Sequence, residues 1–114
     1  MNILVKRGEI YYFDLGIGIG SEQRGKRPCL VVQNNIGNKY SPCTIILPLT
    51  TSITKATIPT QIEYIIQGNW GLIYGEQVRC VDKRRICGAR IDYIEDMSIV
   101  NQALCISLAL ECAV

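Results

Sequence analysis

Apolar and polar side chains follow a strand-like pattern over most of this chain, in alternating stretches and short apolar runs. The segments with this pattern are residues 10–15, 30–32, 43–49 (ending near Thr50), 60–66, 72–81 and 87–91. Turn-forming residues separate them, and residues 37–42 are expected to form one tight helical turn or loop. Many short strands with little helix before residue 94 predict a small, strongly bent antiparallel barrel, a mainly β (α+β) fold.

One helix is expected at the C-terminal end, beginning near Glu95. Asp92, three residues before Glu95, resembles a capping box, and acidic residues suit the positive end of a helix dipole. Two apolar stripes follow, the first of Met97, Val100, Leu104 and Leu108, the second of Ile99, Ala103, Ile106 and Leu110. One stripe predicts packing on the barrel. The other has two interpretations, a contact in a homodimer or a side covered by loops of the same chain.

Length and composition predict one globular domain spanning residues 1–114. Hydrophobic residues make up 48% of the sequence and the mean hydropathy is +0.17, which is enough for a full core. The longest uncharged run near the C-terminus, residues 97–110, is shorter than the ~20 apolar residues of a membrane span. The cations at positions 6 and 7 follow the first apolar residues rather than precede them, unlike a signal peptide. We therefore expect a cytoplasmic protein that makes no membrane contact.

The cysteines predict neither a disulfide framework nor a zinc site. The chain has six of them, no C-x-x-C pair and no histidine. Several lie in apolar runs, where a free cysteine behaves as a small hydrophobic residue. We expect reduced thiols, no metal and no cofactor.

The net charge is only +2, but it is unevenly distributed. Residues 1–40 hold six cations and three anions, and residues 79–90 hold five cations and one anion. Residues 91–114 hold four anions and no cation. This pattern favours a phosphate-binding face built from the two basic segments, with the acidic helix turned away. The alternative is that each cluster is an ordinary solvated surface.

A long, glycine-rich connection, residues 16–27, joins the first two predicted strands. Its cations are Arg24, Lys26 and Arg27. Pro28 holds Arg27 extended at the mouth of the next strand, because a residue before proline disfavours the helical conformation. The connection nearly matches two nucleotide-binding motifs, but Ser21 replaces the third glycine of one and Arg27 replaces the Ser or Thr of the other. Both motifs must also open a helix, whereas a strand follows here, so we reject them.

Several motifs in a fixed order connect this chain with a known family. They are G-S-E-Q-R-G-K-R-P-C-L-V-V-Q-N at 20–34, N-N-I-G-N-K-Y-S-P at 34–42, P-L-T at 48–50, E-Q-V-R at 76–79 and A-L-C-I-S-L-A-L at 103–110. Together they resemble the MazF/PemK family of toxin endoribonucleases, over nearly the whole chain, with residues 67–74 the least similar part. The resemblance implies an SH3-like, PemK-type barrel with a C-terminal helix.

The resemblance also implies the catalytic residues. The family's arginine lies in a G-x-R-P motif, which is Arg27 here, and its threonine closes the third strand, which is Thr50. RNA cleavage requires removal of the 2′-hydroxyl proton, protonation of the leaving 5′-oxygen and stabilisation of phosphoryl charge. An arginine stays protonated, so its expected task is a bidentate hold on the phosphoryl oxygens. Glu76 is a weaker candidate for the base.

Polar residues near this pair are candidates for RNA binding. Single-stranded RNA exposes the edges of its bases to such groups. The candidates are Ser21, Glu22 and Gln23 in the first connection, Lys55, and Gln77 with Arg79, which are two apart on a predicted strand. One departure from the family is the G-I-G-I-G sequence at 16–20, where the family often has proline. It predicts a more mobile loop.

The resemblance implies a sequence-specific, metal-independent endoribonuclease that cuts single-stranded mRNA, leaving a 2′,3′-cyclic phosphate and a 5′-hydroxyl. It further implies a homodimeric toxin of a type II toxin–antitoxin system, silenced by an antitoxin whose acidic, disordered tail occupies the RNA groove. The alternatives are a non-catalytic barrel that binds a protein target such as gyrase, and a simple nucleic-acid-binding module, for which affinity would depend on salt without cleavage.

Overall fold

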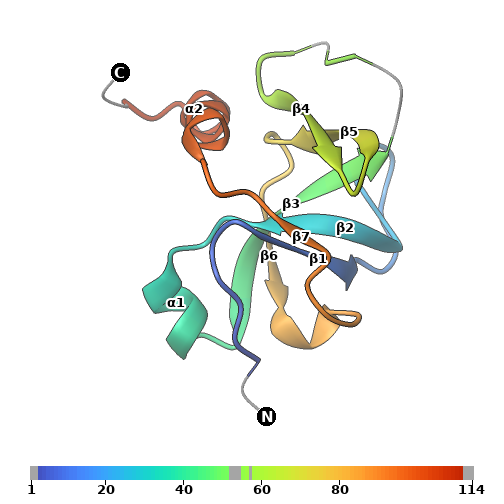
Figure 1. Cartoon of the computed structure of the whole chain (residues 1–114), viewed down its shortest axis with the longest axis vertical. Helices are drawn as coiled ribbons and strands as arrows, with labels where there is room; N and C mark the ends of the chain where they lie inside the picture. The colour runs from blue at the N-terminus through green and yellow to red at the C-terminus, as the bar shows by residue number, and fades with distance from the viewer. Residues whose placement is uncertain (1–2, 52–54, 57, 112–114) are drawn as a thin grey trace.

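Within the residues that the computed structural model describes, 3–51, 55–56 and 58–111, seven strands form one curled antiparallel sheet (Figure 1). The elements in chain order are β1 (Glu9–Asp14), β2 (Lys26–Val31), α1 (Asn35–Tyr40), β3 (Cys43–Thr51), β4 (Gln61–Ile66), β5 (Asn69–Tyr74), β6 (Arg79–Asp82), the 3-10 turn η1 (Lys83–Arg85), β7 (Asp92–Tyr93) and α2 (Ser98–Ser107). The mainly β prediction, with a bent sheet and a C-terminal helix, is confirmed. No helix in the described residues is long and apolar enough to cross a membrane.

The nine-residue strand β3 is the centre of the sheet. The strand order is β4-β5-β3-β2-β1-β7, and β6 also pairs with β3. One part of β3 therefore pairs with β6 and the other with β5, while β2 pairs with its middle. The sheet bends sharply because one continuous strand belongs to both of its halves.

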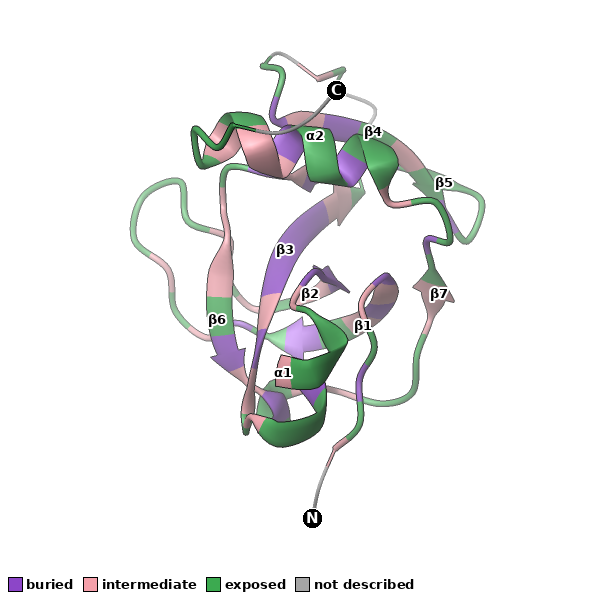
Figure 2. Cartoon of the chain, turned by 90° about the vertical axis from the view of Figure 1, so that its left-hand side faces the viewer, coloured by how far each residue is buried: buried purple, intermediate pink, exposed green. Residues whose placement is uncertain are grey.

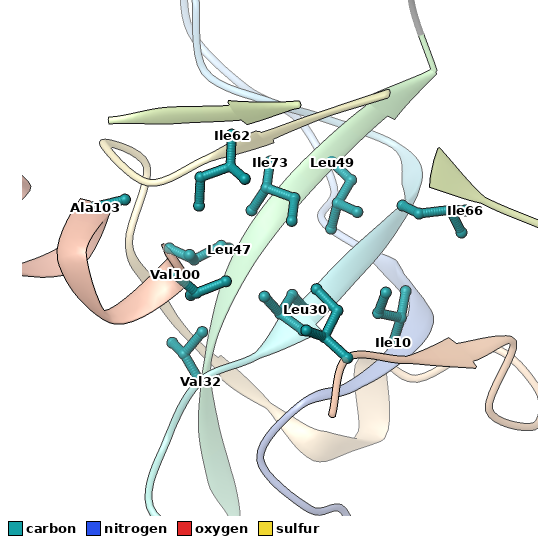
Figure 3. Close-up of a cluster of buried hydrophobic side chains, with 11 residues drawn as sticks. Ile10, Leu30, Val32, Leu47, Leu49, Ile62, Ile66, Ile73, Val100 and Ala103 are labelled. Carbon is teal, nitrogen blue, oxygen red and sulfur yellow. The ribbon is translucent and has the colours of Figure 1, made fainter. Parts of the chain in front are cut away.

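Both faces of the sheet carry a hydrophobic cluster. Neighbouring strand residues point to opposite faces, so the facing pair Leu30 and Leu47 lies in one cluster and the next pair, Val31 and Ile46, lies in the other. The first cluster fills the space between the sheet and α2 (Figure 3). The second contains Val5, Phe13, Leu15, Cys29, Val31, Ile46 and Val81. The candidate functional residues lie at the border of this second cluster.

Helix α2 begins three residues later than the sequence predicts. The backbone N–H of Ile94 donates to the carbonyl of Gly8 at 2.7 Å, so the chain is still extended beside β1 where the helix was expected to begin. Asp92 lies in β7 instead of capping the helix. Met97, at the N-cap position, makes no side-chain cap hydrogen bond. The predicted capping box is wrong.

Only one side of α2 is buried within the described structure. Val100 and Ala103 are 2% and 3% exposed and point toward the sheet (Figure 3). Ile99, Ile106, Leu108 and Leu110 are between 51% and 63% exposed, and much of the outer side of α2 is green in Figure 2. Ala103 of the second stripe is buried, whereas Ile99, Ile106 and Leu110 of that stripe are exposed within the described residues, and cover of this side by loops of the chain stays a prediction. A homodimer contact stays a prediction.

Two of the predicted strands differ from the structure. Residues 72–81 form β5 and β6 with a break at 75–78, because Gly75 packs against the carbonyl of Thr60 and donates to it at 2.9 Å. A side chain at Gly75 would place its Cβ 2.4 Å from that oxygen, so the chain turns away from β4 here. Residues 87–91 lie along β1 through two backbone hydrogen bonds but form no regular strand, and β7 follows at Asp92–Tyr93.

The basic residues of positions 79–90 do not share one face. Lys83 is only 3% exposed, and its ammonium group donates to a backbone carbonyl of α1. Arg84 and Arg90 form ion pairs with carboxylates at 3.0 and 3.3 Å. Arg85 donates to the last carbonyl of β1 at 3.0 Å, and Arg79 donates to the connection that follows β1. The predicted phosphate-binding face is therefore narrower than the charge count suggested.

The cysteines follow the sequence prediction at four of the positions that the structure describes. Cys29, Cys43, Cys80 and Cys87 are free thiols. Cys105 belongs to a disulfide, so the prediction of a reduced thiol is wrong there; the spacing of the cysteines gave no signal for that bond. Cys112 lies outside the described residues.

Candidate functional site

Arg27 and Thr50 come together from neighbouring strands. In the antiparallel pairing of β2 with β3, Cys29 lies opposite Pro48. Continuing this register by two residues places Arg27 opposite Thr50. Both are partly exposed, and both share the sheet face of Cys29, since they are two residues from a facing pair. A guanidinium and a hydroxyl therefore lie at the edge of the second cluster, where the core gives way to solvent.

The strand and the preceding turn fix the position of Arg27. β2 begins at Lys26, earlier than the apolar run indicates, and Arg27 faces Phe13 across the β1–β2 ladder. The Nε of Arg27 donates to the carbonyl of Arg24 at 3.1 Å. Its two Nη atoms carry four more N–H donors, and these bond to no described residue. The Nη edge can therefore bind an anion.

The connection between β1 and β2 is held closed at its base. The N–H of Leu15 donates to the carbonyl of Gly25, and the N–H of Gly25 donates to the carbonyl of Gly16, both at 2.8 Å. Gly16 and Gly25 have φ values of 70° and 72°, in the left-handed region that favours glycine. Two glycines therefore allow the chain to leave β1 and re-enter β2 in a tight paired base.

Two side chains from the β6 region hold the rest of this loop. Gln77 accepts from the backbone N–H of Gln23 at 3.1 Å and donates to the carbonyl of Ser21 at 3.3 Å. Arg79 donates to the carbonyls of Gln23 and Leu15 at 3.2 and 3.4 Å. In this structure Gln77 and Arg79 position the loop's backbone, and their binding to RNA stays a prediction.

The loop and the β5–β6 turn enclose a groove of about 400 Å³. It is lined by Ile19, Ser21, Glu22, Glu76, Gln77, Val78 and Arg79. Four of the predicted RNA-binding residues thus line one groove, together with the weaker candidate Glu76. Gln23 lies beside them, and its side-chain Oε1 is buried without a hydrogen-bond partner in the described structure. Ile19 and Val78 line the groove as well, although the sequence gave no signal for either.

Glu76 lies in the turn rather than on a strand. Its carboxylate accepts hydrogen bonds from the hydroxyl of Thr60 at 3.3 Å and from the amide of Gln61 at 3.1 Å. The predicted strand over residues 72–81 would have included Glu76, which is wrong because the strand is interrupted here. Lys55 is exposed in the connection between β3 and β4 and is not among the residues that line the groove.

A buried thiol lies between the two arginines of the site. Burial raises the pKa of Cys29 to about 12, although the charges of Arg79 and Arg27 act in the opposite direction. Both guanidinium groups therefore lie close enough to this sulfur to act on it, which links the end of β2 with β6. Cys29 stays a neutral thiol at physiological pH and contributes packing rather than nucleophilic chemistry.

Substitution Gln77→Leu is expected to loosen the loop. It removes two hydrogen bonds to backbone groups, each contributing about 1 kcal/mol. Amide hydrogen exchange at Gln23 should accelerate by roughly fivefold or more, since a difference of about 1.4 kcal/mol is tenfold. The control is Gln102→Leu, at an exposed position of α2. Unchanged exchange at Gln23 would contradict the role of Gln77 as the contact that closes the loop.

These features define a class of protein: a small, histidine-free bent barrel with a polar groove and an arginine at the start of β2. The model of the PemK-like, MazF-like toxins of type II toxin–antitoxin systems matches residues 6–108. The chain is 44% identical over 115 residues to endoribonuclease EndoA of Bacillus subtilis strain 168, covering 95% of this chain and 97% of that protein. The chain belongs to this PemK-like, MazF-like toxin family, as the sequence motifs indicated.

Solved structures share the fold. An endoribonuclease from a mycobacterial species, determined with its cognate antitoxin, is 27% identical, with a TM-score of 0.77 and coverage of 96% of this chain and 99% of that one. MazF of Deinococcus radiodurans is 19% identical, with a TM-score of 0.80 and coverage of 95% and 99%. The curled sheet with its C-terminal helix is therefore the fold of MazF proteins.

Proposed function

We propose that this protein is an endoribonuclease that cuts single-stranded mRNA at a short recognition sequence and acts as the toxin of a type II toxin–antitoxin pair. The observation that carries this proposal is the placement of Arg27 and Thr50 at matching positions of β2 and β3. Membership of the toxin family and the 44% identity to an endoribonuclease support the activity.

The chemistry follows from what an arginine and a hydroxyl can do. The 2′-oxygen attacks the phosphorus in line, and the phosphoryl oxygens gain negative charge in the transition state. The Nη edge of Arg27 donates two parallel hydrogen bonds to these oxygens, which stabilises the more highly charged state. Thr50 contributes a neutral hydrogen bond to the same phosphate. The products are a 2′,3′-cyclic phosphate and a 5′-hydroxyl.

The acid–base steps do not use an imidazole, because the chain has no histidine. In the residues that the structure describes, no group of three or more Cys, Asp or Glu side chains could hold a metal ion. We propose a metal-independent reaction, as the resemblance to the family implies. Glu76 stays the weaker candidate for the base, and its carboxylate already accepts hydrogen bonds from Thr60 and Gln61.

The groove reads the RNA bases through its polar edge. Ser21, Glu22 and Gln23 present a hydroxyl, a carboxylate and an amide, which can bond to base edges that are open in single-stranded RNA. Glu22 accepts from the backbone N–H of Ile19 at 2.8 Å, which fixes the tip of the loop. Gln77 and Arg79 hold this edge in place. The positive charge of Lys55 attracts a phosphate of the bound RNA.

The protein acts as a homodimer and is silenced by an antitoxin. The exposed apolar side of α2 supports self-association, since it carries no charged residue. The free Nη edge of Arg27 suits a carboxylate of the acidic, disordered segment that we propose for the antitoxin. The mycobacterial relative solved with its antitoxin supports this assignment.

The test is incubation of the purified protein with a long single-stranded RNA in excess EDTA. We expect discrete cuts at a recurring short motif, and new 5′ ends that polynucleotide kinase labels without prior phosphatase treatment, because they carry hydroxyl groups. Sequencing of the labelled ends gives the recognition motif. Intact RNA in the presence of well-folded protein would overturn the proposal.

A further inference from the structure

Cys43 and Cys80 lie close together on the adjacent strands β3 and β6, outside the groove. The β3–β6 ladder places Cys43 opposite Asp82 and Cys80 opposite Ile45, so the cysteines are diagonal neighbours on the same face of the sheet. Cys80 is exposed and Cys43 is partly buried. The Cys80 thiol lies close enough to Cys43 to contribute to the raised pKa of that residue.

The surroundings of this pair allow oxidation from the solvent side. Partial burial raises the pKa of Cys43, and the neighbouring Cys80 and Asp82 raise it further. Cys43 is therefore the less reactive partner at neutral pH, and the exposed Cys80 is the one that an oxidant can reach. An exposed cysteine beside a second thiol that can resolve it is the usual arrangement of a redox-sensitive site.

We propose that Cys43 and Cys80 form a reversible disulfide when the protein meets a peroxide, and that this bond lowers RNA cleavage. In the first step the sulfur of Cys80 attacks hydrogen peroxide, giving a sulfenic acid and one water. In the second step the sulfur of Cys43 displaces the sulfenic oxygen as a second water and forms the S–S bond. Overall two thiols and one peroxide give one disulfide and two waters, and a dithiol reductant reverses the change.

The bond acts on the groove because β6 must move to form it. Diagonal neighbours in an antiparallel ladder have Cα atoms about 7–8 Å apart, whereas most disulfides span about 4.4–6.8 Å. β6 has four residues and pairs with β3 along one edge, so it can shift by the small distance required. Arg79 directly precedes Cys80 and donates to the loop carbonyls of Gln23 and Leu15. A shift of β6 therefore pulls on the contacts that hold the loop.

Peptide mapping tests the bond independently of RNA cleavage. Trypsin separates the two cysteines, with Cys43 in residues 40–55 and Cys80 in residues 80–83. After treatment with hydrogen peroxide and blocking of free thiols, we expect a cross-linked peptide lighter by two hydrogens than the sum of its parts. It should disappear with dithiothreitol and in Cys43→Ser and Cys80→Ser. Cys87→Ser, at another free cysteine, is the matched control and should still form it.

Amide exchange and RNA cleavage are then measured on the same oxidised and reduced samples. Amide exchange at Gln23 should accelerate in the oxidised wild type, and RNA cleavage, which rests on the proposed function, should fall by at least fivefold and recover with dithiothreitol. Cys80→Ser should keep its activity in peroxide. Absence of the cross-linked peptide would overturn the proposal, and so would a cross-linked protein with unchanged exchange at Gln23. A protein that never cleaves RNA but shows the peptide and the faster exchange would refute the proposed nuclease and keep the coupling between this pair and the loop.

Discussion

Arg27→Lys is expected to lower the rate of RNA cleavage by at least a hundredfold, although the positive charge is kept. A lysine ammonium is a point charge on a flexible stem and cannot make the two parallel hydrogen bonds of a guanidinium. Loss of such a donor pair at a developing charge costs about 2.7 kcal/mol or more. The measurement is the single-turnover rate on a short RNA that contains the recognition motif, with RNA affinity determined separately.

The matched control for this prediction is Arg24→Lys in the same loop. The backbone carbonyl of Arg24 accepts from Arg27, whereas its side chain is exposed, so the substitution keeps the contact that orients Arg27. We expect Arg24→Lys to cleave at close to the wild-type rate. If Arg27→Lys retained most of the activity while folded, the guanidinium would have no special role, and the assignment of Arg27 would fail.

Phe13→Ala is expected to reduce the free energy of unfolding by about 3–5 kcal/mol, the usual range for a buried Phe→Ala change. Phe13 is fully buried in the second cluster, and its ring meets the edge of Tyr11 with centroids 6.4 Å apart. A domain of this size has a total stability of about 5–15 kcal/mol, so the loss is a large fraction of it.

Urea denaturation followed by circular dichroism measures this loss. Ile17→Ala, in the loop that follows β1, is the control, because Ile17 is 97% exposed and surface changes usually stay within about 0.5 kcal/mol. A loss of less than 1 kcal/mol for Phe13→Ala would mean that the second cluster repacks and does not depend on this ring.

The sequence predicted the fold class and the composition of the site because both depend on local signals. Alternation along β4 and the apolar run of β3 are visible without tertiary information, and the G-x-R-P motif places Arg27 at the start of a strand. The break at Gly75 was not predictable, because residues 72–81 look continuous and the contact of Gly75 is with the carbonyl of Thr60, the residue before β4. The late start of α2 also depends on a residue distant in sequence, since the backbone N–H of Ile94 donates to the carbonyl of Gly8.

The site was predicted as a set of residues but not as an arrangement. Gln77 and Arg79 were expected to contact RNA, whereas in the structure their donors and acceptors hold the loop backbone. Such a role needs a partner more than fifty residues away, and sequence spacing gives no information on it. The burial of Lys83 was missed for a similar reason, since a lysine is almost never fully buried unless it is paired.

The contacts made by the basic residues of positions 79–90 affect how the proposed ribonuclease would bind RNA. Binding of a polyanion releases counterions in proportion to the phosphates neutralised, and a long row of free cations would hold any transcript at low salt. Here Lys83 is buried, and Arg84 and Arg90 are already neutralised by carboxylates. Of the five cations in residues 79–90, only Arg79 and Arg85 are then neither buried nor paired with a carboxylate in the described structure. Under the proposed function, this segment contributes less sequence-independent attraction for RNA than its five cations suggest, which leaves more of the selection between transcripts to the bases bound in the groove.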